Sequence, residues 1–257
     1  MSATRVAIRI RNGVKKTLKL YGLLRNSRHR GALRKGVAAA IEHEPLLRSL
    51  VCKYVVDIGA NKGQFALVAR ACFQAAKIVS FEPLQRPSAV FREVFSGDAN
   101  VQLHEVAIGP QATSTLIHVS HREDSSSLLP IADAQDALFP GTAEARTESI
   151  QVGPLRTFIS SNDIVAPALL KLDVQGYELQ ALMGCEELLL DFSFVYVECS
   201  FLELYSGQAL AHEVIRWLAE RHFILAGVYN VTYTYEGLAV QADFLFRRED
   251  AGTAGAH

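Results

Sequence analysis

The stretch Lys53-Tyr-Val-Val-Asp57-Ile-Gly59-Ala-Asn61-Lys-Gly63-Gln-Phe65 decides the fold of this chain. Residues 54–58 form a short apolar, β-branched run, which is typical of a buried strand. Two glycines follow it, and residues 64–73 then carry apolar side chains at helical spacing. A strand, a glycine turn and a helix in this order seat a nucleotide-like ligand at the edge of an open α/β sheet, against the free N–H groups of the helix start.

The acidic residues near this turn argue against a dinucleotide. Asp57 ends the strand, and the glycines are spaced Gly-x-x-x-Gly rather than Gly-x-Gly-x-x-Gly. A carboxylate there would repel a pyrophosphate but suits the sulfonium and amino groups of S-adenosylmethionine. The next strand ends in Glu82, which can accept hydrogen bonds from both hydroxyls of a ribose. An Asp-x-Gly sequence alone is often just a tight turn. The presence of both Asp57 and Glu82 is what favours S-adenosylmethionine.

Length and composition are those of one α/β domain that can bury a sizeable core. The formal net charge of -1 hides an asymmetry, because residues 1–35 hold 11 of the 26 basic residues and no acid. The four cysteines lack Cys-x-x-Cys spacing, which predicts free thiols in a reducing compartment. No apolar run approaches the length of a membrane span, and the N-terminus lacks the apolar core of a secretory signal. We therefore expect a cytoplasmic location, with possible peripheral contact at a membrane surface.

Residues 1–50 are predicted to be a basic helical leader, and three interpretations of it compete. The first is a solvated helix docked on the acidic body of the chain. The second is a helix of residues 1–35 on an anionic membrane surface, since apolar side chains fall near one helical face. The third, nucleic-acid binding, is disfavoured because no aromatic residues alternate with the basic ones. The lack of acids also agrees with a transit peptide.

Strand and helix patterns alternate along the rest of the chain, which predicts a parallel, doubly wound sheet. A short polar turn at residues 230–237 joins the last two strands, so we expect them to form an antiparallel hairpin at the sheet edge. The long segment 121–141 is polar and irregular by pattern, which in a compact domain usually means a functional loop. The predicted strands lie at residues 54–58, 77–82, 100–107, 114–119, 169–173, 192–198, 223–229 and 239–246. We expect the strand at 114–119 to be antiparallel to the strand before it, through the Gly-Pro-Gln turn.

Several motifs resemble the FkbM-type methyltransferase family. The most specific is Lys171-Leu-Asp173-Val-Gln-Gly176-Tyr-Glu178. The others, in chain order, are Asp57-Ile-Gly-Ala-Asn61-Lys-Gly63, Phe81-Glu82-Pro83, Ala107-Ile-Gly, Ser126-Ser127-Leu128, Val197-Glu198 and Gln241-Ala-Asp243-Phe-Leu-Phe. Together they span residues 53–247 and leave the basic leader outside. One departure is Leu155-Arg156, where the family often has Leu-Asp, and this puts in doubt a contact that the acid would make with substrate.

The resemblance implies a class I methyltransferase-like fold, an α/β Rossmann-like sheet of seven mostly parallel strands with the last strand antiparallel. It also implies an S-adenosylmethionine-dependent O-methyltransferase, because family members mostly methylate hydroxyl groups of sugars, polyketides and glycolipids. We expect the methyltransferase domain to cover residues 51–248 and residues 249–257 to be a flexible tail. The expected partner is a small-molecule, saccharide or glycolipid acceptor and not a nucleic acid.

The predicted site lies where the strands end. Cofactor contacts are expected at Asp57, Gly59, Asn61, Gly63, Glu82, Pro83 and Ala107. Asp173 and Glu198 end neighbouring strands, and we predict that they form the acceptor side. They are also the candidate ligands of a divalent cation such as Mg²⁺. His121, in the polar segment, is a candidate general base, since an imidazole can take a proton near neutral pH.

Two other functions stay open at this point. A binding module could keep the fold and lack activity, and a nucleotide-dependent oxidoreductase would share the strand, turn and helix. Asp57 and the Gly-x-x-x-Gly spacing disfavour the oxidoreductase. Titration with each cofactor would separate the three functions.

Overall fold

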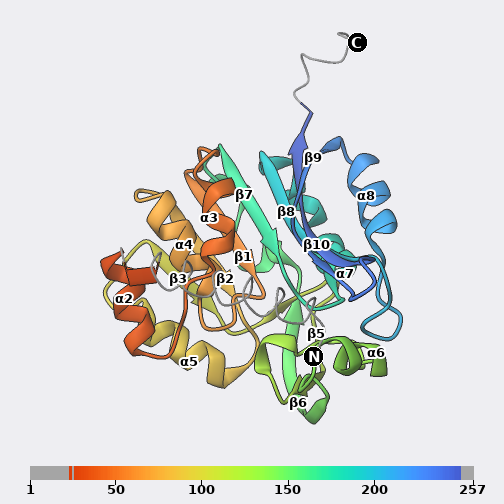
Figure 1. The fold of residues 1–257 in the computed structure, drawn as a ribbon. Helices are drawn as coiled ribbons and strands as arrows, with labels where there is room; N and C mark the ends of the chain where they lie inside the picture. The colour runs from red at the N-terminus through yellow and green to blue at the C-terminus, as the bar shows by residue number, and fades with distance from the viewer. Residues whose placement is uncertain (1–22, 25, 250–257) are drawn as a thin grey trace.

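A computed structural model describes residues 23–24 and 26–249, and a seven-stranded sheet in the order β3-β2-β1-β7-β8-β10-β9 forms its centre (Figure 1). The strands are β1 (Tyr54–Ile58), β2 (Lys77–Phe81), β3 (Val101–His104), β7 (Ala168–Leu172), β8 (Phe194–Ser200), β9 (Phe223–Tyr233) and β10 (Ala239–Arg248). The pairs from β3 to β8 are parallel, and β10 is antiparallel to both of its neighbours. The predicted doubly wound, mostly parallel sheet with an antiparallel last strand is therefore confirmed.

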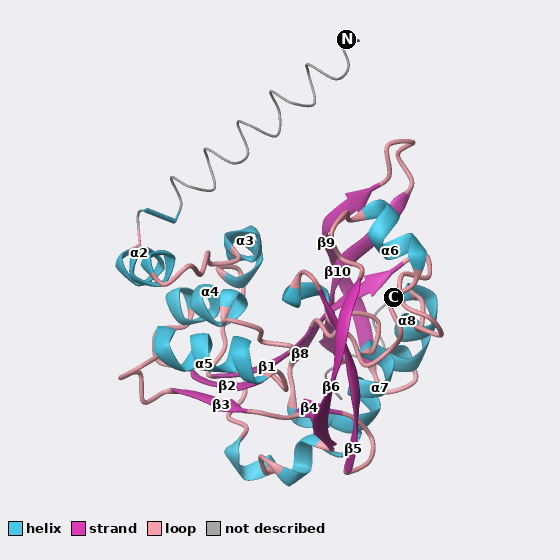
Figure 2. Ribbon diagram, turned by 90° about the horizontal axis from the view of Figure 1, so that it is seen from below, coloured by secondary structure: helices cyan, strands magenta, loops and turns pink. Residues whose placement is uncertain are grey.

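Helices cover both faces of this sheet, as Figures 1 and 2 show. One face carries α2 (Ser27–Arg34), α3 (Glu44–Leu47), α4 (Gln64–Cys72) and α5 (Gln85–Val94). The other face carries α7 (Glu178–Cys185) and α8 (Ala211–Ala219). Short 3₁₀ turns complete these layers: η1 (Ile41–His43), η3 (Leu155–Thr157), η4 (Ser161–Asp163) and η5 (Glu186–Asp191).

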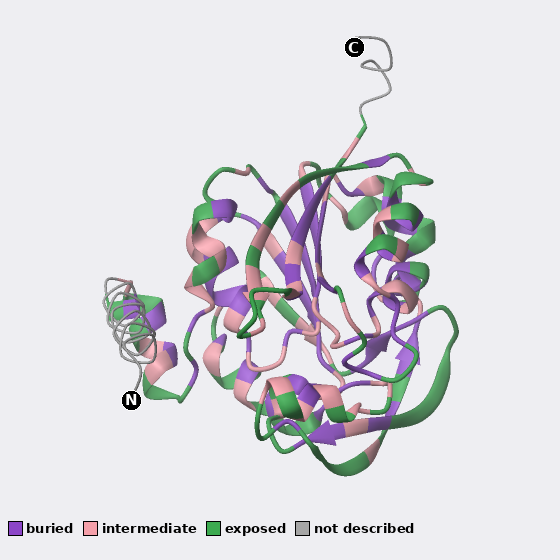
Figure 3. Cartoon of the chain, turned by 45° about the vertical axis from the view of Figure 1, so that its right-hand side comes forward, coloured by how far each residue is buried: buried purple, intermediate pink, exposed green. Residues whose placement is uncertain are grey.

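Strand β1 is buried on both faces, and its side chains alternate between two apolar clusters. Tyr54, Val56 and Ile58 pack on the side of α7 and α8, whereas Val55 packs on the side of α4. Side chains of a strand point alternately to opposite faces, so Asp57 falls on the α4 face with Val55. Figure 3 shows the buried sheet between helices whose outer surfaces are exposed. This register decides which polar side chains reach the site.

A second, three-stranded sheet stands beside the first, in the order β4-β6-β5. Its strands are β4 (Ala107–Ile108), β5 (Thr113–Ser120) and β6 (Glu144–Gly153). The strand expected at residues 100–107 is in fact divided between β3 and β4, which belong to different sheets. The expectation that residues 114–119 would pair with the strand before them is also wrong, because β5 pairs with β6. The sequence pattern identifies a strand, but it does not show which distant strand pairs with it.

The segment 121–141 is more ordered than its polar sequence suggested. It contains η2 (Glu123–Ser125) and α6 (Asp133–Leu138). The Asp136 side chain accepts hydrogen bonds from the backbone N–H groups of Gly141, Thr142 and Ala143. These contacts close the segment onto itself, and local hydrogen bonds of this kind leave no hydrophobic periodicity to detect.

The described part of the leader packs on the domain. Leu23, Ala32 and Leu47 are buried in the same apolar cluster as α4, and Ala40 N donates to Gln64 O at 3.0 Å. The predicted helical leader does not continue as one helix to residue 50, because its last part has η1 and α3, with Pro45 in the first turn of α3. The predictions for residues 1–22, and for the tail beyond Glu249, lie outside the described residues. The four cysteines are free, as predicted, and in residues 23–24 and 26–249 no helix combines the length and apolar character needed to cross a bilayer.

Candidate active site

A cavity of about 450 Å³ opens at the carboxyl ends of the parallel strands. The glycine turn after β1, the ends of β2 and β7, η1, the segment 122–128 and residues of β9 and β10 all contribute to its wall. Seven of the predicted site residues line it: Gly59, Asn61, Glu82, Pro83, Ala107, Asp173 and Glu198. The parallel strands thus bring most of the predicted residues to one edge, as open α/β sheets do.

Glu82 fixes one end of the cavity. Its Oε2 accepts a hydrogen bond from Asn61 N and its Oε1 accepts one from Leu84 N, both at 2.9 Å. Burial raises the pKa of Glu82 to about 7, and the two backbone donors oppose this rise. Each carboxylate oxygen has a second lone pair, so Glu82 can still accept hydrogen bonds from a ligand.

The first glycine of the turn is required by the backbone of the neighbouring strand. Gly59 has a φ of 78°, and a Cβ there would lie 1.8 Å from Asp173 O. Gly63 is the N-cap of α4 and packs against Phe91 and Phe95, away from the cavity lining. Any contact of Gly63 with a cofactor therefore stays a prediction, whereas Gly59 brings the turn close to the end of β7.

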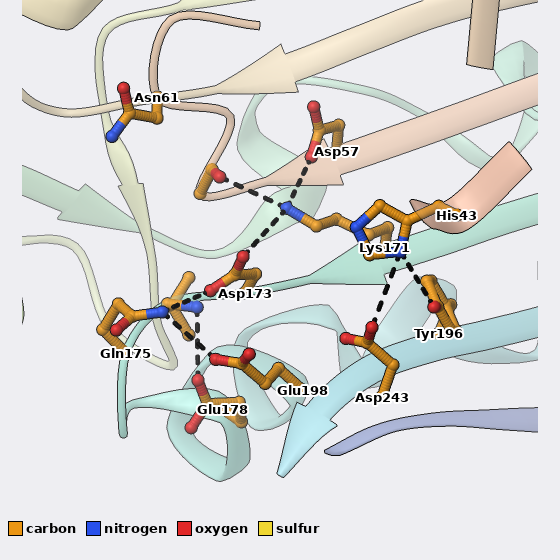
Figure 4. Close-up of polar contacts among 12 residues, drawn as sticks. His43, Asp57, Asn61, Lys171, Asp173, Gln175, Glu178, Tyr196, Glu198 and Asp243 are labelled. Atoms are coloured by element: carbon orange, nitrogen blue, oxygen red, sulfur yellow. Dashed lines mark hydrogen bonds and ion pairs between the residues drawn. The ribbon is translucent and has the colours of Figure 1, made fainter. Parts of the chain in front are cut away.

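Asp57 faces a buried lysine that the sequence analysis did not single out. Lys171 Nζ lies 3.0 Å from Asp57 Oδ1, and it donates a hydrogen bond to Gly59 O at 3.3 Å (Figure 4). Burial alone would lower the pKa of Lys171, but the carboxylates of Asp57 and Asp173 raise it above its ordinary value. Asp57 itself does not line the cavity. Its predicted contact with a cofactor is untested, and its visible role is to hold the Lys171 ammonium against the glycine turn.

One amide bridges two carboxylates at the other end, and a second amide contacts one of them. Gln175 Nε2 donates to Asp173 Oδ1 at 2.6 Å and to Glu198 Oε2 at 3.2 Å. Gln241 Nε2 donates to Glu198 Oε1 at 2.6 Å. Burial, followed by the charge of Asp173, raises the pKa of Glu198 well above its ordinary value. Asp173 does not cap α7, whose N-cap is Tyr177.

Glu178 supports the turn that carries Asp173. Its Oε1 accepts hydrogen bonds from Val174 N at 3.2 Å and Gly176 N at 3.1 Å. Burial raises the pKa of Glu178 to about 7. Glu178 therefore points back under the crevice rather than into solvent, and it orders the backbone between β7 and α7.

A second group of polar residues at this end was missed by the sequence analysis. His43 Nδ1 lies 2.9 Å from Tyr196 Oη and 3.5 Å from Asp243 Oδ2 (Figure 4). Asn230 Nδ2 donates to Asp243 Oδ2 at 2.7 Å. His43, Asn230 and Asp243 line the same cavity as Asp173. The sequence carried one signal, the Gln241-Ala-Asp243 motif, but nothing placed His43 opposite it.

His121 lies elsewhere. It is exposed and borders an adjoining depression with Arg122, Arg146 and Lys62, and it is absent from the lining of the main cavity. Its neighbours in residues 122–128 do line the main cavity. The prediction of His121 as a general base is untested, and the structure offers His43 as an imidazole inside the cavity.

Among the described residues, no group of three or more His, Cys, Asp or Glu side chains is arranged to hold a metal ion. Asp173 and Glu198 approach each other through Gln175. The predicted cation at this pair is therefore a question for experiment.

Two relatives in the comparison with known proteins carry methyltransferase names. The 2-O-methyltransferase NoeI of Sinorhizobium fredii (strain NBRC 101917 / NGR234) is 28% identical over 165 residues, which cover 60% of this chain and 66% of that protein. Methyltransferase 1 of Beauveria bassiana (strain ARSEF 2860) is 23% identical over 146 residues, which cover 52% of this chain and 59% of that protein. The alignments thus span less than two thirds of either relative.

Solved structures of methyltransferases resemble the fold. The precorrin-6y C5,15-methyltransferase of Geobacter metallireducens GS-15 has a TM-score of 0.44 at 12% identity, over 83% of this chain and 95% of that chain. The model of the methyltransferase FkbM domain matches residues 57–225. Since this match covers more than half of the chain, the protein belongs to the FkbM methyltransferase family.

Proposed function

We propose that this protein is an S-adenosylmethionine-dependent O-methyltransferase whose acceptor is a hydroxyl group of a sugar, glycolipid or polyketide-type molecule. The observation that carries the proposal is the division of one cavity into two chemically different ends. One end has the glycine turn and Glu82, and the other has Asp173, Glu198 and Asp243.

The first end suits the adenosine part of the cofactor. Glu82 presents free lone pairs to the two hydroxyls of a ribose, and Asn61 N is held beside it. The apolar side chains of Phe81, Leu84 and Ile108 line the same end and suit an adenine ring. When bound there, S-adenosylmethionine supplies an electrophilic methyl group on a sulfonium.

The second end suits a neutral acceptor with several hydroxyl groups. The carboxylates of Asp173, Glu198 and Asp243 accept hydrogen bonds, and Gln175 and Gln241 hold two of them in place. An anionic acceptor would meet repulsion from the charge of Asp173, because the buried ammonium of Lys171 is already paired with Asp57. A neutral acceptor with several hydroxyl groups binds without this repulsion. The name of the relative NoeI, a 2-O-methyltransferase, agrees with methyl transfer to oxygen.

The chain's own contribution to the reaction is position and charge. Residues at the carboxyl ends of β7 and β8, and in the amino-terminal part of the antiparallel β10, hold the acceptor hydroxyl opposite the cofactor end, so that the oxygen approaches in line. Residues 122–128 border the cavity and reduce its contact with solvent. The same arrangement would let Asp173 and Glu198 hold a Mg²⁺ ion if the reaction uses one.

Calorimetric titration of the full chain tests the cofactor part of this proposal. S-adenosylmethionine and S-adenosylhomocysteine should bind, and NADPH should not. Transfer of a tritiated methyl group to a panel of methyl glycosides and a glycolipid extract tests the acceptor part. Binding of NADPH in place of S-adenosylmethionine would indicate the oxidoreductase. Cofactor binding without transfer to any hydroxyl would indicate the non-catalytic module.

The basic N-terminal residues have a separate role in this proposal, a peripheral contact of residues 1–35 with an anionic membrane. Its support is the one-sided charge, with 11 basic residues and no acid. A membrane position would bring the cavity close to a glycolipid acceptor.

A further inference from the structure

We propose that His43 and Asp243 form the proton-accepting pair of the methyl transfer, with Nε2 of His43 taking the proton of the acceptor hydroxyl. This inference rests on the proposed O-methyltransferase function and deepens it by naming the base. Neither residue lies in the part of the chain that the family model matches, which is residues 57–225.

The position of His43 is set by its packing. Its ring makes edge contacts with Phe65, at 5.4 Å between ring centroids, and with Tyr196, at 5.6 Å. The ring therefore stands between α4 and the face of the sheet that carries Asp57 and Lys171. Its backbone belongs to η1, which Ala40 ties to Gln64 O. A general base needs this kind of fixed orientation.

Nδ1 of His43 is the nitrogen that faces the protein. Tyr196 Oη lies 2.9 Å from it and Asp243 Oδ2 lies 3.5 Å from it. In the proposed arrangement Tyr196 donates its hydroxyl proton to Asp243, and the Tyr196 oxygen accepts a hydrogen bond from Nδ1–H of His43. Asn230 Nδ2 is 3.3 Å from Nδ1, and its shorter contact, 2.7 Å, is with Asp243 Oδ2. These partners hold the neutral ring as the Nδ1–H tautomer.

Nε2 is then the nitrogen with a free lone pair. No side chain or backbone group of the described residues hydrogen-bonds it, and His43 lines the cavity that also contains Asp173. The acceptor hydroxyl would thus face Nε2 while Asp243 faces Nδ1 on the other side of the ring. A base that is oriented by a carboxylate in this way activates weak hydroxyl nucleophiles.

The charges around His43 support this role. Burial lowers the pKa of His43, and the charge of Asp243 opposes this effect most strongly. Glu42 of η1 and Asp173 after β7 also raise this pKa, whereas Lys171 of β7 lowers it. The ring is therefore neutral at neutral pH and can accept a proton, and Asp243 stabilises the imidazolium that results.

The step balances without another reactant. The acceptor O–H bond breaks and its proton passes to Nε2 of His43. The oxygen forms a bond to the methyl carbon, and the S–CH₃ bond breaks with its electron pair going to sulfur. The products are a methyl ether, S-adenosylhomocysteine and one proton, which leaves the imidazolium for solvent.

The tautomer of His43 can be tested without any acceptor. Long-range ¹H–¹⁵N correlation spectra of the full chain should show His43 with the proton on Nδ1 at pH 8. In Asp243→Asn the pKa of His43 should fall, because the charge that raises it is removed. Finding the proton on Nε2, or a pKa unaffected by Asp243→Asn, would overturn the proposal.

Two variants test the role in turnover. His43→Gln should bind S-adenosylhomocysteine within twofold of wild type and lower kcat by about 100-fold or more. The matched control is His118→Gln, which removes another histidine paired with a carboxylate, Glu144 at 2.7 Å, outside the cavity. The control should keep wild-type kcat. Near-wild-type kcat in His43→Gln would reject the base. If the wild type does not bind S-adenosylhomocysteine, the proposed function is rejected instead. The ¹H–¹⁵N spectra still decide the tautomer of His43 in that case.

Discussion

Lys171 Nζ lies 3.0 Å from Asp57 Oδ1, with side chains that are 6% and 0% exposed, because these two residues are register partners on the neighbouring parallel strands β7 and β1. The ammonium group and the carboxylate are buried side by side on one face of the sheet, and each stabilises the charge of the other. The pair also places an ammonium group against the carbonyl of Gly59.

Removing one member of this pair should be more harmful than removing both. Lys171→Met leaves the Asp57 carboxylate buried without its partner, and we expect a loss of about 3–5 kcal/mol in the free energy of unfolding. Lys171→Met combined with Asp57→Asn should recover most of that loss. Urea unfolding measures both, with Lys53→Met at an exposed position as the control. Equal losses in the single and double variants would show that the two charges are not coupled.

Glu82 is expected to determine cofactor affinity. Glu82→Gln keeps the size of the side chain but replaces one acceptor oxygen by a donor, which then faces either Asn61 N or Leu84 N. Binding of S-adenosylhomocysteine should weaken by about 1–3 kcal/mol in a calorimetric titration. Glu105→Gln, which changes a carboxylate paired with Arg92 outside the cavity, should bind as wild type does. If both variants bind equally well, the ribose site is misplaced.

Asp173 should affect turnover and spare the cofactor. Asp173→Asn keeps the contact with Gln175 but removes the charge beside the acceptor, so we expect kcat to fall about 100-fold or more while the Kd of S-adenosylhomocysteine stays within twofold. Asp191→Asn, at the end of η5 and outside the cavity lining, is the control.

A chelator refines that experiment. If Asp173 and Glu198 hold a cation, EDTA should abolish transfer and Mg²⁺ should restore it. If Asp173 acts by hydrogen bonding alone, EDTA should have no effect. Wild-type kcat in Asp173→Asn would remove Asp173 from the mechanism under either condition.

Glu178 should make stability depend on pH. Its pKa in the folded chain is about 7, above the ordinary value of 4.5, so its contribution to stability is fully present below pH 4.5 and is lost as pH rises through 7. Between pH 4.5 and 8, wild type should therefore lose up to about 3 kcal/mol relative to Glu178→Gln. Urea unfolding of both proteins at several pH values measures this difference, in which the similar titration of Glu82 cancels. A difference that stays constant with pH would contradict the raised pKa of the buried Glu178 carboxyl group.

The membrane prediction can be tested by a cut that leaves the packed residues intact. Deleting residues 1–22 keeps α2 and its buried Ala32, whereas a longer deletion to residue 35 would remove them. The full chain should sediment with phosphatidylserine vesicles at low salt, and the shortened chain should not. Added salt should weaken the binding because it screens exposed charges. Sedimentation that is equal in both chains would exclude the deleted residues as the membrane contact.

The end of the cavity at the glycine turn could be predicted because its residues are close together in sequence. A strand, a glycine turn and an acid at the end of the next strand occupy residues 54–82, and their local pattern fixes where Gly59, Asn61 and Glu82 lie. The alternation of elements predicted the parallel, doubly wound sheet, and the short last turn predicted the antiparallel hairpin at its edge. These are short-range signals that a single sequence carries.

The other end of the cavity could be predicted only in part. Asp173 and Glu198 were expected there because they end neighbouring strands, and both line the cavity, but His43 was not expected. His43 and Asp243 are 200 positions apart in the chain, and they meet because η1 packs on the sheet face and β10 inserts beside β8. Asp57 was expected to face a ligand, but its partner depends on the register of β1 with β7, which no local pattern gives. His121 was chosen for its polar neighbours, yet only those neighbours reach the main cavity.

Strand β10 comes last in the sequence but second from the edge of the sheet, between β8 and β9. A fragment trimmed to residues 57–225 would therefore lack β10 and most of β9. The long edge of β8 would be left without a partner, ready to pair with another chain. The segment that the family model matches therefore ends before the folding unit does. Only a chain that extends through residue 248 can pair β8 with all of β10.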